Sequence, residues 1–224
     1  MPSKLLIAAS HAAHAARSSR QFGIEVRDVR IDGKAVMQRV RSERDRFVKL
    51  TQESIDKIPD GIRLRGLAKF VDHGTLSLDD GRMIEAGSVV IATGSLPSVP
   101  DAFAKLGNRI LTNDTIFDLE DLPNSLAVIG SGSIGLELAQ AMARLGVEVT
   151  LFDNGDRLGG VRCDKVHAAL KTVIEDDLRL VLMLNSSQVR RMLGSALSGA
   201  VIHRATPRSI MRWLRRGVPL ISLA

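Results

Sequence analysis

The sequence is poor in cysteine and in aromatic residues, which argues against a disulfide-stabilised protein and against one that recognises bases or sugars by stacking. Cys163 is the only cysteine among 224 residues, so no internal disulfide can form and a reducing, cytoplasmic location is expected. Six Phe, one Trp and no Tyr leave few side chains for stacking on bases or sugars. No apolar run approaches the roughly 18–20 residues of a membrane-spanning helix, so no membrane span is expected.

Positive charge is concentrated at one end of the chain. Residues 185–224 contain seven Arg and no Lys, Asp or Glu, and the net charge of +6 therefore leaves −1 for residues 1–184. The tail has no sustained helical or strand period, so it is either a basic arm for polyanions or a stretch from a shifted reading frame. No recognition motif accompanies the arginines, and specific nucleic-acid binding is not expected.

The first part of the chain combines two predicted helices with short strands. One helix runs from Pro2 to about Arg20 and is stopped by Gly23, and a second begins after Asp32 as N-cap and ends at Pro59. The acid-free, Ala-rich opening also resembles a transit peptide, but a helix explains the same composition and is favoured. Strands are predicted at GIRLRGLAKFV, TLSL and MIEAGSVVIATG, with Asp79-Asp80-Gly81 as a hairpin turn.

The following part alternates strands and helices, which is typical of an α/β fold. Strands are predicted at SLAVIG, VEVTLFD and LRLVLML. Helices are predicted at 133–145, stopped by Gly146, and at 164–176. The segment GSLPSVP, stiffened by two prolines, predicts a crossover between two domains.

The segment AVIGSGSIGLELAQAM matches G-x-G-x-x-G at Gly130, Gly132 and Gly135, with a strand before it and a helix after it. Gly130 would permit the tight turn, Gly132 the close approach of a pyrophosphate, and Gly135 the packing of helix on strand. The phosphates would lie at the helix N-terminus, where free N–H groups and the helix dipole favour anions. The alternative is a glycine-rich turn without a ligand.

Asp153 ends the next predicted strand, where its carboxylate would accept hydrogen bonds from a ribose 2′-hydroxyl. This position favours NAD over NADP, because the carboxylate would repel a 2′-phosphate. Arg157 lies close enough in sequence to weaken that preference.

Two stretches, VVIATGSLPSVP and TNDTIFDLEDLPNSLAVIGSGSIGLELAQAMARLGVEVTLFD, carry a resemblance to a known family. They resemble the flavin-dependent pyridine nucleotide–disulfide oxidoreductases, and the dihydrolipoamide dehydrogenase branch is most similar. The resemblance runs from Met1 to about Leu184. It implies an incomplete FAD-binding α/β domain with two N-terminal helices at 1–100, a partial Rossmann-type NAD(P)-binding domain at 101–184, and a basic tail at 185–224.

The resemblance also implies roles for single residues. Lys4 would lie beside the flavin ring, Glu137 would pair with that lysine near the nicotinamide, and Ile134 would lie over the nicotinamide path. Without the resemblance, a solvated Lys4, a surface Glu137 and a core Ile134 would be expected. The residues assigned to NAD are Gly130, Gly132, Ser133, Ile134, Gly135, Glu137 and Asp153, and those assigned to FAD are Lys4, Ala68, Thr93 and Gly94.

Several parts of the family pattern are missing from this sequence. The resemblance implies that a first G-x-G-x-x-G and the redox-active C-x-x-x-x-C precede Met1, and that the dimerisation domain with its H-x-x-x-x-E pair follows Leu184. We therefore expect Met1 to be an internal position of a larger enzyme, and we expect no catalytic residue in this chain. Cys163 is expected to be a bystander thiol, and His11 with His14 a poor metal site for lack of further ligands.

Three functions stay open at this point. The first is an FAD- and NAD-dependent oxidoreductase of the dihydrolipoamide dehydrogenase type, inactive as this incomplete chain. It would act on a small-molecule or lipoyl dithiol, and intact family members form homodimers. The second is a non-catalytic NAD-binding module, and the third is a non-functional truncated product.

Overall fold

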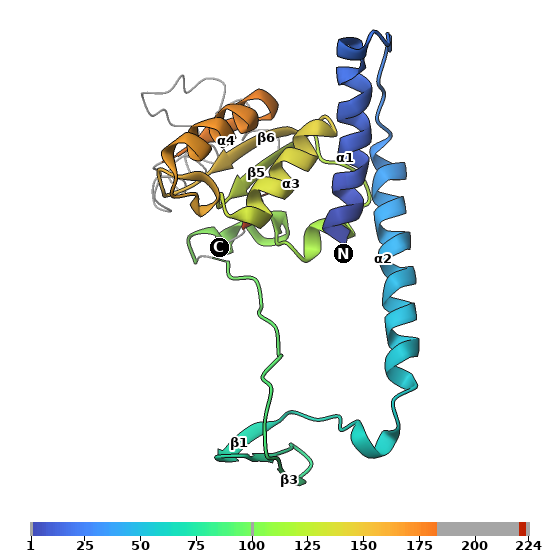
Figure 1. The fold of residues 1–224 in the computed structure, drawn as a ribbon, viewed down its shortest axis with the longest axis vertical. Helices are drawn as coiled ribbons and strands as arrows, with labels where there is room; N and C mark the ends of the chain where they lie inside the picture. The colour runs from blue at the N-terminus through green and yellow to red at the C-terminus, as the bar shows by residue number, and fades with distance from the viewer. Residues whose placement is uncertain (1, 100, 183–219, 223–224) are drawn as a thin grey trace. The chain divides into compact units, whose positions relative to one another are not determined.

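The computed structural model describes residues 2–99, 101–182 and 220–222, and the chain divides into two compact units (Figure 1). The larger unit comprises Met1–Arg44 and Pro97–Ala224, and the smaller unit comprises Asp45–Leu96. One boundary falls inside the predicted crossover GSLPSVP, whereas the other falls within a helix and was not predicted. Of the predicted basic tail, 185–219 and 223–224 lie outside the described residues.

The larger unit contains a parallel sheet with the strand order β4-β8-β5-β6-β7. Its order β7-β6-β5-β8 corresponds to the order 3-2-1-4 of doubly wound nucleotide-binding sheets, in which the strand order reverses beside the first strand. The predicted α/β fold is confirmed. The strands are β4 (Ile110–Leu111), β5 (Ser125–Ile129), β6 (Glu148–Phe152), β7 (Arg179–Val181) and β8 (Leu220–Ser222).

Helices α3 (Ser133–Arg144) and α4 (Asp164–Asp177) form the connections between β5, β6 and β7, as predicted. Gly146 stops α3 with a φ of 93°, a left-handed conformation that favours glycine. The strands β5 and β6 are short apolar runs and are almost entirely buried, as expected of strands inside a parallel sheet.

The two N-terminal helices, α1 (Pro2–Ser18) and α2 (Gly33–Asp56), also confirm the predicted segments. A short 3₁₀ turn continues α1 to Gly23, whose φ of 78° ends it. The Asp32 carboxylate accepts a hydrogen bond of 2.9 Å from the Ala35 N–H, so Asp32 caps α2 as predicted.

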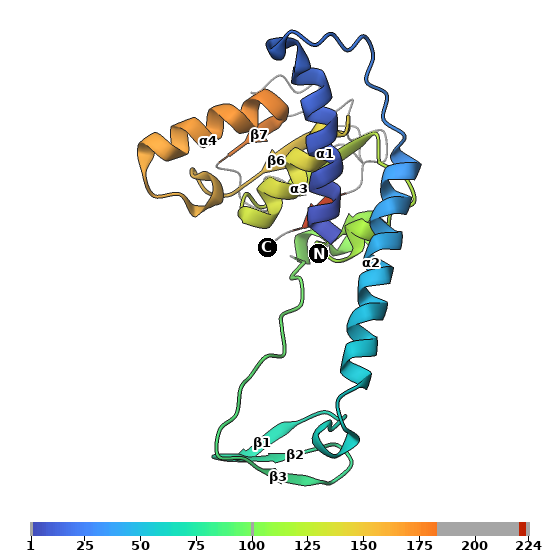
Figure 2. The same cartoon turned by 45° about the vertical axis from the view of Figure 1, so that its right-hand side comes forward.

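Both N-terminal helices contribute to the core of the larger unit. Helix α1 packs along α3, and the two lie side by side in both ribbon views (Figures 1 and 2). Leu6 of α1 and Met37 of α2 are fully buried in the same apolar cluster as Leu138 and Met142 of α3. Residues 1–44 are thus packed with the Rossmann-type sheet in one compact unit. The assignment of 1–100 to FAD and 101–184 to NAD stays a prediction.

Ion pairs join the helices of this unit at two places. The Asp177 carboxylate of α4 accepts hydrogen bonds from Gln140 Nε2 (2.8 Å) and Arg144 Nε (3.0 Å), both on α3. Arg44 of α2 pairs with Asp118 at 2.6 Å, in the segment before β5. These contacts connect α3 with α4, and α2 with the segment before β5.

The smaller unit is built around an antiparallel sheet of β1 (Lys69–Asp72), β2 (Thr75–Ser77) and β3 (Met83–Glu85). The predicted hairpin turn at Asp79-Asp80-Gly81 is confirmed, because β2 pairs with β3 and Gly81 has a φ of 86°. Arg82 closes the turn with a 2.6 Å hydrogen bond to Asp80. That bond is the main reason that the pKa of the Asp80 carboxyl lies below its usual value.

Two predicted strands are shorter than their sequence patterns indicated. Of GIRLRGLAKFV and MIEAGSVVIATG, only Lys69–Asp72 and Met83–Glu85 contain paired strand residues. Residues 86–99 belong to no strand, and Val90 is 88% exposed. A strand needs a partner for its backbone hydrogen bonds, and no described segment supplies one here. Leu78 is the one buried apolar side chain among the described residues of this unit.

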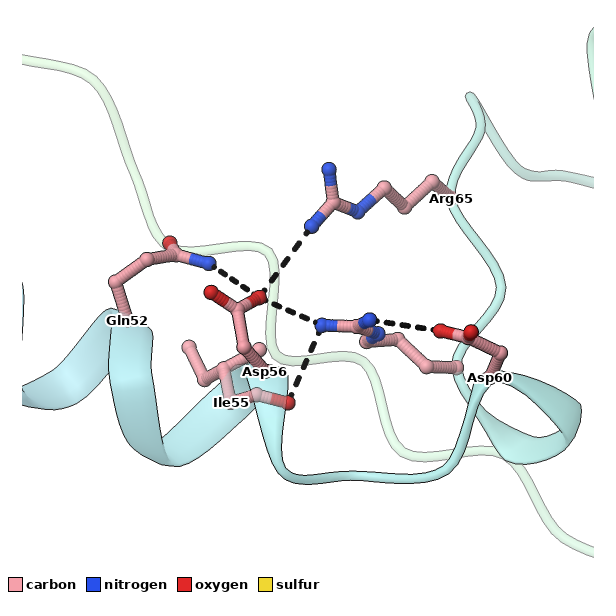
Figure 3. Close-up of polar contacts among 6 residues, drawn as sticks. Gln52, Ile55, Asp56, Asp60 and Arg65 are labelled. Carbon is pink, nitrogen blue, oxygen red and sulfur yellow. Dashed lines mark hydrogen bonds and ion pairs between the residues drawn. The ribbon is translucent and has the colours of Figure 1, made fainter.

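A polar network holds the chain reversal after α2 (Figure 3). Arg63 donates to the Ile55 carbonyl (3.3 Å), to Asp56 (2.8 Å) and to Asp60 (2.8 Å), and Gln52 donates to Asp56 (2.9 Å). The hydrogen bond from Gln52, followed by that from Arg63, lowers the pKa of the Asp56 carboxyl. The guanidinium thereby satisfies a carbonyl at the C-terminal end of the helix.

Candidate functional site

The three glycines of the G-x-G-x-x-G segment lie in the strand-to-helix bend between β5 and α3. Gly130 has a φ of 103°, and its N–H donates to the Phe152 carbonyl at 2.8 Å, which ties the bend to β6. Gly132 is the N-cap of α3, and its carbonyl accepts a hydrogen bond from the Leu136 N–H at 3.0 Å. Gly135 is buried in the first turn of α3. Only Gly130 needs the left-handed backbone conformation that glycine tolerates.

The N-terminus of α3 is open to a ligand. A Cβ on Gly132 would meet no atom within 4 Å, and the next residues, Ser133 and Ile134, are exposed. Gly132 has no side chain with which to cap the helix, so the first N–H groups of α3 are left without a side-chain partner. N–H groups at the positive end of the helix dipole form an anion-binding position.

The Asp153 side chain faces this bend. Asp153 follows β6, and its Oδ2 atom accepts a hydrogen bond from the Ser131 N–H inside the glycine segment. Its Oδ1 atom accepts a hydrogen bond of 2.7 Å from the Gly155 N–H. An ionised carboxylate offers about four acceptor positions, so about two stay open to the hydroxyls of a ribose. The carboxylate and the open helix end thus belong to one continuous site.

Arg157 does not pair with Asp153. Its Nη2 atom donates to Asp164 Oδ1 at 2.6 Å, and its Nη1 atom donates to the Arg162 carbonyl at 3.0 Å. The hydrogen bond with Asp164 is the main reason that the pKa of Arg157 is raised. The sequence placed Arg157 near the site, but it did not identify Asp164 as the partner that directs the side chain.

The expected pair between Lys4 and Glu137 is absent from the structure. Lys4 lies on α1 and Glu137 on α3, both are exposed, and no hydrogen bond or ion pair joins these two described side chains. The roles that the resemblance implies for Lys4 and Glu137 beside the flavin stay predictions. Ile134 is 50% exposed, so the alternative of a core residue is wrong at that position.

The residues predicted to contact FAD are divided between the two units. Lys4 belongs to the larger unit, whereas Ala68, Thr93 and Gly94 belong to the smaller unit and are exposed. No hydrogen bond joins the latter three to one another within the described residues, and Thr93 and Gly94 lie in the segment without strand partners. Their flavin-binding roles stay predictions.

The other chemically notable side chains do not assemble into a site in the part of the chain that is described. Cys163 is exposed and precedes α4, and His11 and His14 are exposed on α1. Within the described ranges, no group of three His, Cys, Asp or Glu residues could hold a metal ion. None of the helices in those ranges has the length and apolar character that crossing a membrane requires.

Two backbone partners of the site were not predicted from the sequence. Gly155 supplies an N–H to Asp153, and the Gly159 N–H donates to the Ser131 carbonyl at 2.8 Å, which ties the loop after β6 to the glycine bend. The Asp-Asn-Gly order after β6 was a usable signal, because Asp side chains often bond to the backbone two residues further on. The contact of Gly159 had no local signal.

Comparison with known sequences identifies relatives among flavoenzymes. The chain is 35% identical over 167 residues to a dihydrolipoyl dehydrogenase of Geobacillus stearothermophilus, covering 71% of this chain and 34% of that protein. It is 31% identical over 186 residues to a mercuric reductase of Lysinibacillus sphaericus, covering 81% of this chain and 33% of that protein. The chain therefore spans about a third of the length of these relatives.

Comparison with solved structures supports the same fold. The HOCl-induced flavoprotein disulfide reductase RclA from Escherichia coli aligns with a TM-score of 0.64 at 19% identity, over 82% of this chain and 39% of that one. The model of the pyridine nucleotide-disulphide oxidoreductase family matches residues 1–195. The predicted cofactor pair, FAD and NAD(H), is the pair that this family uses. By this match, the chain belongs to the pyridine nucleotide-disulphide oxidoreductase family.

Proposed function

We propose that this chain binds NAD(H) and supplies the nicotinamide-binding part of a flavin-dependent dithiol–disulfide oxidoreductase. The observation that supports this most strongly is the joint geometry of the glycine bend and Asp153. The open N-terminus of α3 and the carboxylate bonded to the Ser131 N–H lie in one site, as binding of a dinucleotide requires.

Each part of the site has a role in this proposal. The N–H groups of Ser133, Ile134 and Gly135 face the pyrophosphate, and the free acceptor positions of Asp153 bind the adenosine ribose. The exposed Glu137 and Ile134 are available on α3 for the nicotinamide end. The bound nicotinamide would supply hydride, while these residues hold and orient it. Lys4, Ala68, Thr93 and Gly94 are proposed as contacts of FAD.

The substrate of the proposed oxidoreductase is a dithiol of the lipoyl kind. The dihydrolipoyl dehydrogenase and the mercuric reductase match this chain at similar identity, so their names alone do not separate the two substrates. The dithiol chemistry needs two sulfurs that form and break a disulfide, and this sequence contains only Cys163. We therefore propose that the 224-residue chain alone does not reduce or oxidise lipoamide. Homodimerisation is a further proposal, by resemblance to intact family members.

A non-catalytic NAD-binding module is the second candidate, and the single cysteine favours it. The nicotinamide residues lie within one βαβ unit, so binding does not need the dithiol chemistry. A non-functional product is the third candidate, because many apolar side chains of the smaller unit are exposed, including Val90 and Ile91. A purified chain that aggregates and shows no cooperative unfolding would support that candidate.

Calorimetric titration of the purified chain with NADH tests the proposal. Asp153→Ala should weaken NADH binding at least tenfold, because it removes hydrogen bonds to a charged acceptor worth about 1.5–3 kcal/mol each. Asp176→Ala is the matched control, since Asp176 is an exposed carboxylate on α4 that makes no hydrogen bond or ion pair with the described residues. Equal NADH affinity in the wild type and Asp153→Ala would contradict the proposed site. Retained flavin absorption would favour the oxidoreductase part over the module.

A further inference from the structure

The loop between β6 and α4 contains an arginine that lies beside the proposed ribose site but is directed elsewhere. A Cβ on Gly155 would lie 3.3 Å from Asp153 Oδ1 and 3.8 Å from the Arg157 backbone nitrogen. The Arg157 backbone and the Asp153 carboxylate therefore both border the position beside Gly155. Its guanidinium is bonded instead to Asp164, the first residue of α4, and to the Arg162 carbonyl.

We infer that Asp164 is a specificity-determining residue, which holds Arg157 away from the ribose 2′-position next to Asp153 and so favours NADH over NADPH. The inference rests on the proposed binding of NAD(H) at Asp153. A free arginine in this loop could form charge-assisted hydrogen bonds with a 2′-phosphate, as arginines do in NADP-binding Rossmann folds. Asp164 thus disfavours NADPH in addition to the repulsion that Asp153 exerts on the 2′-phosphate.

The contacts of the loop determine how strong this selection is. The Arg157 and Asp164 side chains are 41% and 84% exposed, so the pair is a surface ion pair and contributes only modestly. The Arg162 carbonyl adds a second acceptor for the same guanidinium, and the nearby Asp156 carboxylate attracts it as well. We expect release of Arg157 to strengthen NADPH binding by about 1.5- to 5-fold, which is the range of exposed ion pairs.

The experiment measures the ratio of the NADPH and NADH dissociation constants in the full 224-residue chain. Asp164→Asn keeps the shape of the side chain but leaves only a neutral, weaker acceptor for the Arg157 guanidinium, and it should lower the ratio by 1.5- to 5-fold through NADPH alone. The double variant Asp164→Asn with Arg157→Gln should lose that gain, because the gain depends on the freed guanidinium. Asp164→Glu keeps the carboxylate, is the matched control, and should retain the ratio of the wild type.

The outcomes separate this inference from the proposed function. NADH affinity reports in each variant whether the site is folded, and a thermal melt checks the rest of the chain. If the wild type binds NADH and Asp164→Asn has an unchanged ratio, the inference is overturned while the proposed function stands. If the gain persists in the double variant, the inference is also overturned, because Arg157 is then not its cause. If the wild type does not bind NADH, the proposed function fails and the inference fails with it.

Discussion

The substitution Gly132→Ala should separate nucleotide binding from folding. Gly132 has φ and ψ angles of −62° and 175°, which any L residue adopts, and a Cβ there would meet no atom within 4 Å. Alanine lowers the conformational entropy of the unfolded chain, which stabilises the folded state by about 0.4–1 kcal/mol. Alanine is also a poorer N-cap than glycine, which lowers the stability of the folded state by a similar amount. The two effects offset, so the unfolding midpoint should change by no more than about 4 °C.

The same methyl group should strongly weaken NADH binding. It would fill the space through which a pyrophosphate approaches the N–H groups at the start of α3. Hydrogen bonds to charged groups contribute about 1.5–3 kcal/mol, so the loss of one corresponds to roughly a 10- to 150-fold weaker affinity. A large loss of binding with a nearly unchanged melting temperature is therefore the expected result.

Calorimetry with NADH and a thermal melt on the same samples check both halves of this prediction. Gly87→Ala is the matched control, because Gly87 is also exposed, has no atom within 4 Å of its added Cβ, and lies in the smaller unit. Its NADH affinity should equal that of the wild type. NADH binding by Gly132→Ala within twofold of the wild type would refute this prediction, since the pyrophosphate cannot then lie on that helix end.

Two further predictions concern stability. Asp177→Ala should destabilise the larger unit by about 2–3 kcal/mol and lower the melting temperature by roughly 5–10 °C, because it leaves Arg144, only 15% exposed, without its carboxylate. A melt that matches the wild type would contradict this. The pKa of the Asp56 carboxyl is lowered in the folded chain, first by the hydrogen bond from Gln52 and then by that from Arg63. The ionised Asp56 carboxylate therefore stabilises the folded state at pH values above its ordinary pKa of 3.8. That contribution is lost as pH falls through the lowered value. Carboxyl NMR titration should give an Asp56 midpoint below 3.8, and Arg63→Gln should bring the midpoint closer to 3.8; identical midpoints would disprove the assigned cause.

The elements that could be predicted from the sequence are those with local signals. Asp32 caps α2 through its own side chain, Gly23 and Gly146 stop helices by their backbone conformation, and the apolar runs of β5 and β6 were sufficient to predict buried parallel strands. The glycine bend and the position of Asp153 followed for the same reason. Each depends on residues adjacent in sequence or on the order strand, helix, strand.

The elements that could not be predicted depend on distant parts of the chain. The segment 86–94 was predicted as part of a strand, but pairing requires a neighbour, which the described residues do not supply. Conversely, β4 and β8 are too short to give a periodic signal, yet each has a neighbour in the sheet. The hydrogen bond between Arg157 and Asp164 is similarly set by the path of the loop, since the spacing of the two residues does not select one arginine rotamer.

The same distinction explains why the proposed nicotinamide site needs only part of the chain length of the relatives, of which this chain spans about a third. The proposed phosphate position is made by the backbone of one bend, and Asp153 is held against that bend by the Ser131 N–H. The residues from Gly130 to Asp153 belong to one βαβ unit. The proposed flavin contacts instead come from both compact units, and dithiol chemistry needs a second sulfur that this sequence lacks. Binding of the dinucleotide needs only local folding, whereas the transfer of electrons to a disulfide needs groups from several segments. The chain is therefore expected to retain the first property without the second.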